Sequence, residues 1–200
     1  MAVYPGTEKP KLKEANTIDK DHFRETLLSM YSHTGTHTDS PAHLFKKGKS
    51  LDEFSAESFC GRAVLLDCTK LPENSRIDKD MLLSLGEKFE RADFLIIKTG
   101  WEKYWNSEEY FKGFPCIDVE AAQLLTQKCK KGIGVDTISV DPVGKPLEVH
   151  KTLLKTDNFI IIENLCNLDL ISDDEFEIFA LPLKFENSDG APTRVVARIG

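Results

Sequence analysis

Long apolar runs are missing from this sequence. No stretch approaches the ~20 consecutive apolar residues that a membrane-spanning helix needs, so we expect no transmembrane segment. The first six residues, Met1–Gly6, carry no basic region followed by an apolar stretch, and no secretory signal is therefore expected. Both absences favour a cytoplasmic protein without a membrane partner.

A surplus of basic residues is also missing. The chain has 26 Lys and Arg against 33 Asp and Glu, and its net charge is -7. Because nucleic-acid-binding domains usually carry a basic patch, this balance argues against nucleic acid as a main partner.

Cysteine is sparse and irregularly placed. The five cysteines are an odd number, form no CxxC pair and are scattered along the chain (Cys60, Cys68, Cys116, Cys129 and Cys166). A disulfide framework is therefore not expected, and a reducing compartment fits. We interpret each cysteine as a small apolar core residue.

Linkers, low-complexity segments and internal repeats are absent as well, and 200 residues fit one domain, which we place at 1–200. Residues 1–20 are polar and rich in turn-forming types. Helical spacing of apolar residues predicts helices at 78–89, 118–130 and 148–155. Short apolar or alternating runs predict strands at 23–31, 61–68, 94–97, 133–136, 159–162, 176–185 and 193–199. This order predicts a mixed α/β (α+β) domain with a central sheet.

Histidine is scarce, with five in the chain, yet three of them lie at 33–43 together with an aspartate. The spacing is His-x3-His-x-Asp-x3-His, and Gly35, Pro41 and three threonines oppose a helix there. In an extended segment His33, His37, Asp39 and His43 all project to one side, because their numbers are all odd. Gly35 and Pro41 would bend the segment around a centre.

Imidazole and carboxylate groups suit divalent metals such as Zn²⁺ and Mn²⁺. A single histidine is more often a core or surface residue than a ligand, but a cluster of this density favours a metal site. A closed structural zinc site is the alternative, although such sites are usually rich in cysteine. Further ligands are needed, and His150 and Glu163 are the candidates, since Glu163 ends a buried strand. We interpret His22 as a surface residue.

The stretch at 33–43 resembles the HxGxHxDxPxH signature of the cyclase-like metal hydrolases, which include bacterial kynurenine formamidases and isatin hydrolases. Further segments at 4–6, 98–101, 134–141, 150–154, 162–165 and 189–194 are similar to motifs of this family, in the same order. One difference is that the family's first strand is not found ahead of Tyr4-Pro5-Gly6. We therefore expect the sheet to lack an edge strand.

The resemblance implies a swivelling β/β/α domain that forms homodimers or homotetramers and cleaves a small N-formyl or cyclic amide. It implies one or two divalent ions, zinc or alternatively manganese. The ligands would be His33, His37, Asp39, His150 and Glu163, with Asp39 and Glu163 bridging two ions. His43 would be the catalytic acid and base.

Aromatic residues that could hold the substrate are Tyr4, Phe45 and Trp101, for which core packing is the alternative. Tyr4 stands where kynurenine formamidases tend to have tryptophan, a difference that bears on the substrate. Two other functions stay open at this point. One is a non-catalytic, metal-stabilised binding module on the same fold. The other, a serine or cysteine hydrolase, is weakly supported because the sequence has no GxSxG motif.

Overall fold

The computed structural model describes residues 1–128 and 130–200. Seven strands of these residues form a closed barrel in the order β10-β11-β3-β9-β8-β6-β4. Their bounds are β3 His37–Asp39, β4 Cys60–Asp67, β6 Phe94–Lys98, β8 Gly132–Val135, β9 Ile160–Glu163, β10 Glu175–Pro182 and β11 Gly190–Arg198. The mixed α/β prediction is confirmed, and the central sheet of the described residues closes into a barrel. That the sheet lacks an edge strand stays a prediction.

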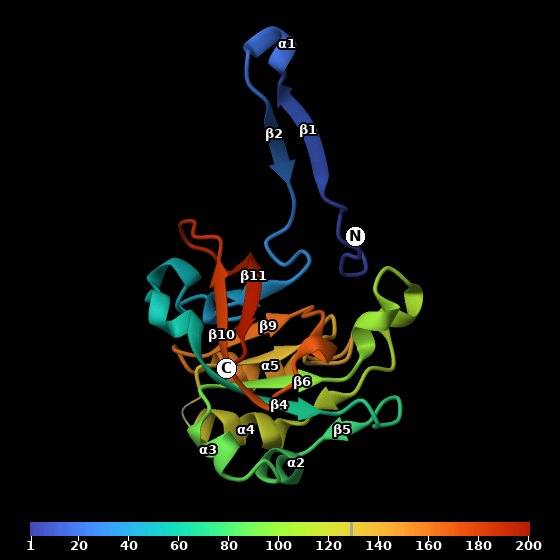
Figure 1. The fold of residues 1–200 in the computed structure, drawn as a ribbon, viewed down its shortest axis with the longest axis vertical. Coiled ribbons are helices and arrows are strands. Elements are labelled where there is room, and N and C mark those ends of the chain that lie inside the picture. The colour runs from blue at the N-terminus through green and yellow to red at the C-terminus, as the bar shows by residue number, and fades with distance from the viewer. Residues whose placement is uncertain (129) are drawn as a thin grey trace.

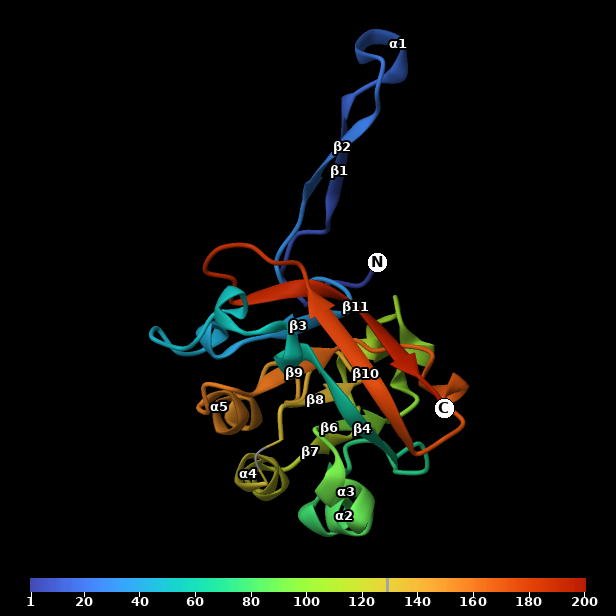
Figure 2. The same cartoon turned by 60° about the vertical axis from the view of Figure 1, so that its left-hand side comes forward.

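The parallel half of the barrel is built from strand–helix–strand units. Strands β4, β6, β8 and β9 run parallel to one another, and helices on one side of the barrel connect them (Figures 1 and 2). These helices are α2 Lys79–Leu83, α3 Glu87–Arg91, α4 Val119–Gln127 and α5 Glu148–Leu154. The short strands β5 Arg76–Ile77 and β7 Cys116–Ile117 pair separately. The apolar runs of the parallel strands are buried on both faces, as parallel sheets require.

The antiparallel half of the barrel brings together segments that lie far apart in the sequence. Strand β3 lies between β9 and β11 and is antiparallel to both. His37 is thereby paired in register with Glu163. This pairing places the histidine-rich segment beside the end of a strand that follows more than a hundred residues later.

The secondary structure differs from the prediction at one helix and contains two elements that were not predicted. The helix predicted at 78–89 is two short helices, because Gly86 takes a left-handed φ of +57° between them. In the N-terminal stretch, for which the sequence analysis named no element, the structure forms β1 Lys11–Asn16 and α1 Ile18–Asp21. Strand β1 pairs with β2 Glu25–Ser29, and this hairpin projects from the body of the molecule (Figure 1).

The cysteines are less uniform than predicted. Cys68 and Cys116 are buried, as expected, but Cys60 is half-buried and Cys166 is exposed; all four are free thiols. Cys129 lies outside the described residues. No described helix has the length and apolarity needed to cross a membrane.

Candidate metal centre

The histidine-rich segment is only partly extended. Gly35 turns the chain with a φ of +70°, β3 then spans His37–Asp39, and a short 3-10 helix begins at Pro41 and contains His43. Within β3, His37 and Asp39 are two residues apart and share one face. The bends at Gly35 and Pro41 bring His33 and His43 to the same centre, so the prediction that all four side chains converge agrees with the structure.

His37 and His150 each keep one ring nitrogen free to face the centre. Nδ1 of His37 lies 2.8 Å from the Gly35 carbonyl oxygen, and Nδ1 of His150 lies 2.7 Å from an Asp141 carboxylate oxygen. Each Nδ1–H donates to its acceptor, which fixes the tautomer and leaves Nε2 as a lone-pair donor. Both Nε2 atoms point toward the carboxylates of the centre.

Two buried carboxylates lie between these nitrogens. Glu163 places one oxygen 3.4 Å from Nε2 of His37 and the other 3.2 Å from Nε2 of His150. Asp39 Oδ1 lies 2.7 Å from Nδ1 of His33 and 3.2 Å from Nε2 of His37, and its Oδ2 lies 3.7 Å from Nε2 of His150. Glu163 therefore faces two histidines and Asp39 faces three, so each carboxylate is placed as a bridging ligand would be.

Asp39 Oδ2 is buried and has no hydrogen-bond partner among the described residues. A buried carboxylate oxygen without a donor is costly, and a cation would satisfy it. The residues present therefore fit a divalent metal. Two groups of three have ligand atoms within 4.8 Å of one another: His33 with His37 and Asp39, and Asp39 with His150 and Glu163. Together they contain the five predicted ligands.

Protons compete strongly for these histidines. Burial alone would lower the pKa of His37, but Asp39 and Glu163 outweigh it and raise the pKa to about 10. Burial likewise opposes protonation of His33, whose pKa the carboxylates of Asp39 and Asp189 raise to about 9. The centre is thus a concentrated negative charge that attracts either protons or a metal cation.

His43 differs from the other histidines of the centre. Burial lowers its pKa below the usual value, and the neighbouring His33 and His150 lower it further, against the opposing effect of Asp39. Its ring lies 4.1 Å from that of His33 between centroids, and its Nδ1 lies 3.9 Å from Asp189 Oδ2. A neutral imidazole at the edge of the centre is suited to accept a proton.

Asp189 is a neighbour of the centre to which the sequence analysis gave no role. Its Oδ2 lies 2.9 Å from Nε2 of His33, and the hydrogen bond from His33 is the main reason that its pKa is lowered to about 2. Together, His33, His43 and Asp189 form a third group of possible ligands. The Asp-Gly pair at 189–190 is the sequence feature that could have indicated this role, because Gly190 begins β11 and is paired with Asp39.

A pocket of about 330 Å³ opens over the centre. This volume suits a small ligand. Beyond the five ligands and His43, the wall consists of Tyr4, Thr7, Tyr31, Ile138, Ser139 and Leu147. Of the three aromatic residues predicted to hold the substrate, the structure brings only Tyr4 to this pocket. Phe45 packs against the main core cluster, and Trp101 is buried in a separate cluster with Tyr110 and Phe114.

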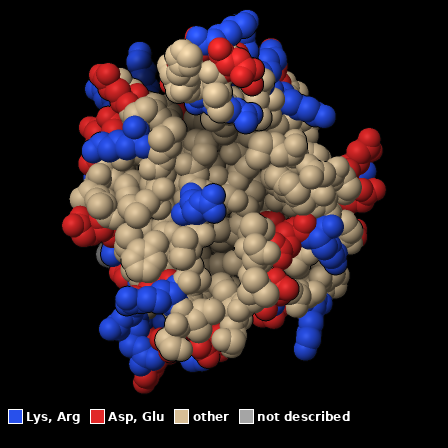
Figure 3. Space-filling view, turned by 45° about the horizontal axis from the view of Figure 1, so that its top comes forward, with Lys and Arg blue, Asp and Glu red and all other residues tan. Residues whose placement is uncertain are grey.

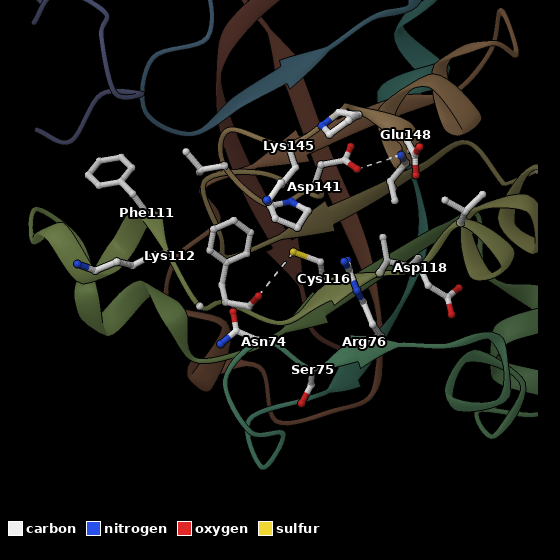
Figure 4. Close-up of a pocket in the computed structure, with 18 residues that line it drawn as sticks. Asn74, Ser75, Arg76, Phe111, Lys112, Cys116, Asp118, Asp141, Lys145 and Glu148 are labelled. Atoms are coloured by element: carbon white, nitrogen blue, oxygen red, sulfur yellow. Dashed lines mark hydrogen bonds between the residues drawn. The ribbon is translucent and has the colours of Figure 1, made fainter.

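Asp141 supports the centre from behind. One carboxylate oxygen accepts from the backbone N–H of Val149, and the other accepts from both the backbone N–H and Nδ1–H of His150. Asp141 therefore caps the first turn of α5 and orients the imidazole at once. A second hollow, of about 620 Å³, is lined by Asp141 together with Arg76, Lys145 and Glu148, and Figure 4 shows these side chains around it.

Known proteins resemble this chain both in sequence and in fold. The model of a family described as "Putative cyclase" matches residues 2–142. A kynurenine formamidase of Bacillus cereus is 34% identical over 172 residues, which cover 86% of this chain and 78% of the relative.

Two solved structures illustrate the likeness in three dimensions. A potential metal-dependent hydrolase with cyclase activity is 30% identical, with a TM-score of 0.80, over 98% of this chain and 90% of the other. Isatin hydrolase A from Labrenzia aggregata, solved with benzyl benzoate, shares the fold with a TM-score of 0.86 at 23% identity, over 100% of this chain and 88% of the other. From the family match and the relatives' identity over most of its length, this chain belongs to the cyclase family.

Proposed function

We propose that this protein is a metal-dependent hydrolase that cleaves a small amide. The observation that carries the proposal is the orphaned Asp39 Oδ2, buried among three imidazoles and a second carboxylate. The relatives named kynurenine formamidase support an amide as the substrate. Zinc is the preferred ion and manganese the alternative, because imidazole and carboxylate ligands suit both.

His33, His37 and Asp39 would hold one ion. His150 would hold a second ion, and the carboxylates of Asp39 and Glu163 would serve both. A divalent ion bound there supplies an acidified water at neutral pH and polarises a carbonyl group. The chain's own residues do the rest. Gly35 and Asp141 fix the imidazoles of His37 and His150, so the ligand atoms are oriented before substrate binds.

His43 is placed to move protons. Because its pKa is lowered, it is neutral near pH 7 and can take the proton of the attacking water. The protonated ring then gives that proton to the leaving nitrogen of the amide. Asp189 Oδ2, 3.9 Å from Nδ1 of His43, favours the positive charge that the ring carries between the two steps.

The pocket wall suggests an aromatic or cyclic amide of modest size. Tyr4, Tyr31, Ile138 and Leu147 provide apolar contact area around the centre. Tyr4 is anchored by its hydroxyl group, which accepts from the N–H of Gly144 at 3.4 Å. The free thiols of Cys60, Cys68, Cys116 and Cys166 fit a reducing, cytoplasmic setting.

Two substitutions of the same kind separate this function from that of a non-catalytic, metal-stabilised module. His37→Asn should lose bound metal and hydrolysis of N-formyl and cyclic amides together. His43→Asn should keep its metal but lose about 10²- to 10⁴-fold in kcat, the usual contribution of a general acid or base. Metal content and turnover are measured on both variants. A His43→Asn protein with unchanged turnover, or a wild-type protein without activity on any such amide, contradicts the proposal.

A further inference from the structure

Asn164 takes a backbone conformation that few residues other than glycine adopt. It directly follows Glu163, the last residue of β9, and its φ is +57°. Of the described residues other than glycine that take a positive φ, Asn164 is the one that is buried. Glycine would adopt this conformation with less strain. Because a buried amide must also be hydrogen-bonded, an asparagine at this position points to a role for its side chain.

Four hydrogen bonds hold Asn164 between three other segments. Its backbone N–H donates to the Thr137 carbonyl oxygen at 3.0 Å, and its own carbonyl oxygen accepts from the Thr36 hydroxyl group at 2.7 Å. In the side chain, Nδ2 donates to the carbonyl oxygen of Gly35 at 2.9 Å, and Oδ1 accepts from the Tyr110 hydroxyl group at 2.9 Å. The residue therefore ties the end of β9 to the turn that precedes β3.

The carbonyl oxygen of Gly35 links this amide to the metal centre. It accepts from Nδ1–H of His37 at 2.8 Å as well as from Nδ2 of Asn164. The two nitrogens lie 3.3 Å apart, since both donate to the same oxygen. The chain turns at Gly35 with a φ of +70°, so the direction of this carbonyl group depends on how the turn is held. Fixing the oxygen fixes the plane of the imidazole and the direction in which Nε2 faces the centre.

Tyr110 completes the orientation of the Asn164 amide. The amide has an acceptor, Gly35, on one side and a hydroxyl donor, Tyr110, on the other. Only one orientation sets its NH₂ group against the acceptor and its oxygen against the donor. Burial raises the pKa of Tyr110, and the nearby carboxylates of Asp136 and Glu163 raise it further, so the hydroxyl group keeps the proton that it donates.

These supporting groups are neutral and shielded from water. Tyr110 is 1% exposed and Asn164 is 4% exposed. Charged side chains instead gather mostly toward the rim of the face shown in Figure 3. Water cannot readily replace a hydrogen bond that is lost in the interior, so loss of either side chain leaves the carbonyl oxygen of Gly35 less firmly held.

We propose that Asn164 and Tyr110 are positioning residues of the metal centre, which hold the imidazole of His37 toward the other metal ligands through the carbonyl oxygen of Gly35. This inference rests on the metal-dependent function proposed above, and it concerns metal binding rather than the substrate. Tyr110 acts on the centre only through Asn164, and Asn164 acts only through the turn.

His37 is thus supported differently from His150. The carboxylate of Asp141 orients His150, whereas a neutral amide acts on His37 through a backbone carbonyl group. Asp39 and Glu163 already lie 3.2 Å and 3.4 Å from Nε2 of His37. A neutral support orients this ligand without a third negative charge beside it.

The first test removes the side chain and keeps the backbone. Asn164→Gly retains the left-handed φ, so the fold is expected to survive, and thermal unfolding of the metal-free protein checks this. Zn²⁺ affinity, measured by competition with a chelator, should fall about 10- to 100-fold, the usual effect of losing a group that orients a ligand. Asn167→Gly is the matched control, because Asn167 is exposed and also has a left-handed φ, of +61°. Wild-type affinity in Asn164→Gly, or an equal loss in the control, overturns the proposal.

A second pair of variants tests the link through Tyr110. Tyr110→Phe should lower Zn²⁺ affinity about 2- to 10-fold, the factor that one neutral hydrogen bond contributes. In the Asn164→Gly background the same substitution should change nothing further. Tyr104→Phe is the control, since Tyr104 packs against the same aromatic cluster and its hydroxyl group has no hydrogen bond among the described residues. Independent losses from the two substitutions overturn the proposal that Tyr110 acts through Asn164.

The proton on Nδ1 of His37 provides a readout that a merely structural role of Asn164 would not move. In zinc-loaded protein, NMR should show this proton exchanging with water faster in Asn164→Gly than in the wild type or in Asn167→Gly. An unchanged exchange rate overturns the proposal. None of these measurements needs a substrate. A protein that binds Zn²⁺ and responds as expected but hydrolyses no amide leaves the inference standing and contradicts the proposed function, whereas a wild-type protein that binds no divalent ion overturns both.

Discussion

Replacing Asp141 by Asn should weaken metal binding at His150 by about 10- to 100-fold while the protein stays folded. The carboxylate receives three hydrogen bonds: 3.0 Å from Val149 N, 2.9 Å from His150 N and 2.7 Å from His150 Nδ1. An Asn side chain has only one acceptor oxygen. If that oxygen keeps the two bonds from His150, the amide NH₂ faces the N–H of Val149, donor against donor.

The expected loss of metal affinity follows from the hydrogen bonds and the charge that the substitution removes. A hydrogen bond to a charged group contributes about 1.5–3 kcal/mol, and 1.4 kcal/mol is tenfold in an equilibrium constant. Loss of the negative charge also makes the imidazole a weaker ligand. Weakening the cap of α5 costs about 1 kcal/mol of folding stability, too little to unfold the chain.

The assay is competition for Zn²⁺ against a chromophoric chelator, with thermal unfolding measured in parallel. Glu148→Gln is the control, because it removes a neighbouring exposed carboxylate that accepts no hydrogen bond from His150. An Asp141→Asn protein with wild-type metal affinity and a normal melting temperature would refute the idea that this carboxylate orients His150.

Three other outcomes are expected. Gly190→Ala should lower metal affinity, because its Cβ would lie 2.4 Å from Cε1 of His33 and displace that ring; chelator competition checks this. Lys130→Met should destabilise the fold by about 2–4 kcal/mol in urea unfolding, because the buried ammonium donates to the carbonyl oxygens of Phe89, Glu90 and Ala92 at the end of α3. In metal-free protein, the raised pKa values of His33 and His37 stabilise the fold fully below pH 6.5, and this contribution is lost as pH rises through about 9 to 10. Metal affinity should rise over the same interval, since the ion displaces those protons; a pH series of melting temperatures with and without Zn²⁺ measures both effects.

The sequence predicted the buried strands well, but of the exposed hairpin it predicted only β2, within residues 23–31. The runs at 94–97 and 159–162 are continuous apolar segments, and they form β6 and β9 within one residue of the predicted bounds. Strand β1 reads Lys-Leu-Lys-Glu-Ala-Asn and buries no face, so it carries no periodic signal of a core. The split between α2 and α3 depends on the φ of Gly86, which spacing alone cannot reveal.

The argument that odd-numbered residues of an extended segment project to one side holds for only part of the candidate site. Parity places His37 and Asp39 on one face because they lie in β3, but His33 and His43 lie outside that strand. They converge because Gly35 and Pro41 turn the chain. Asp189 was given no role because its approach to His33, across 156 positions, depends on the pairing of β11 with β3, of which the Asp-Gly pair at 189–190 is only an indirect sign.

The pairing of His37 with Glu163 also bears on how the protein folds. These residues are neighbours across β3 and β9 although 126 positions separate them (163 − 37), so a long loop must close before they meet. Contacts of such range form slowly, and we expect a centre that needs both strands to be completed late in folding. An ion held there therefore acts mainly by slowing unfolding, and metal should lengthen the lifetime of the native state far more than it speeds its formation.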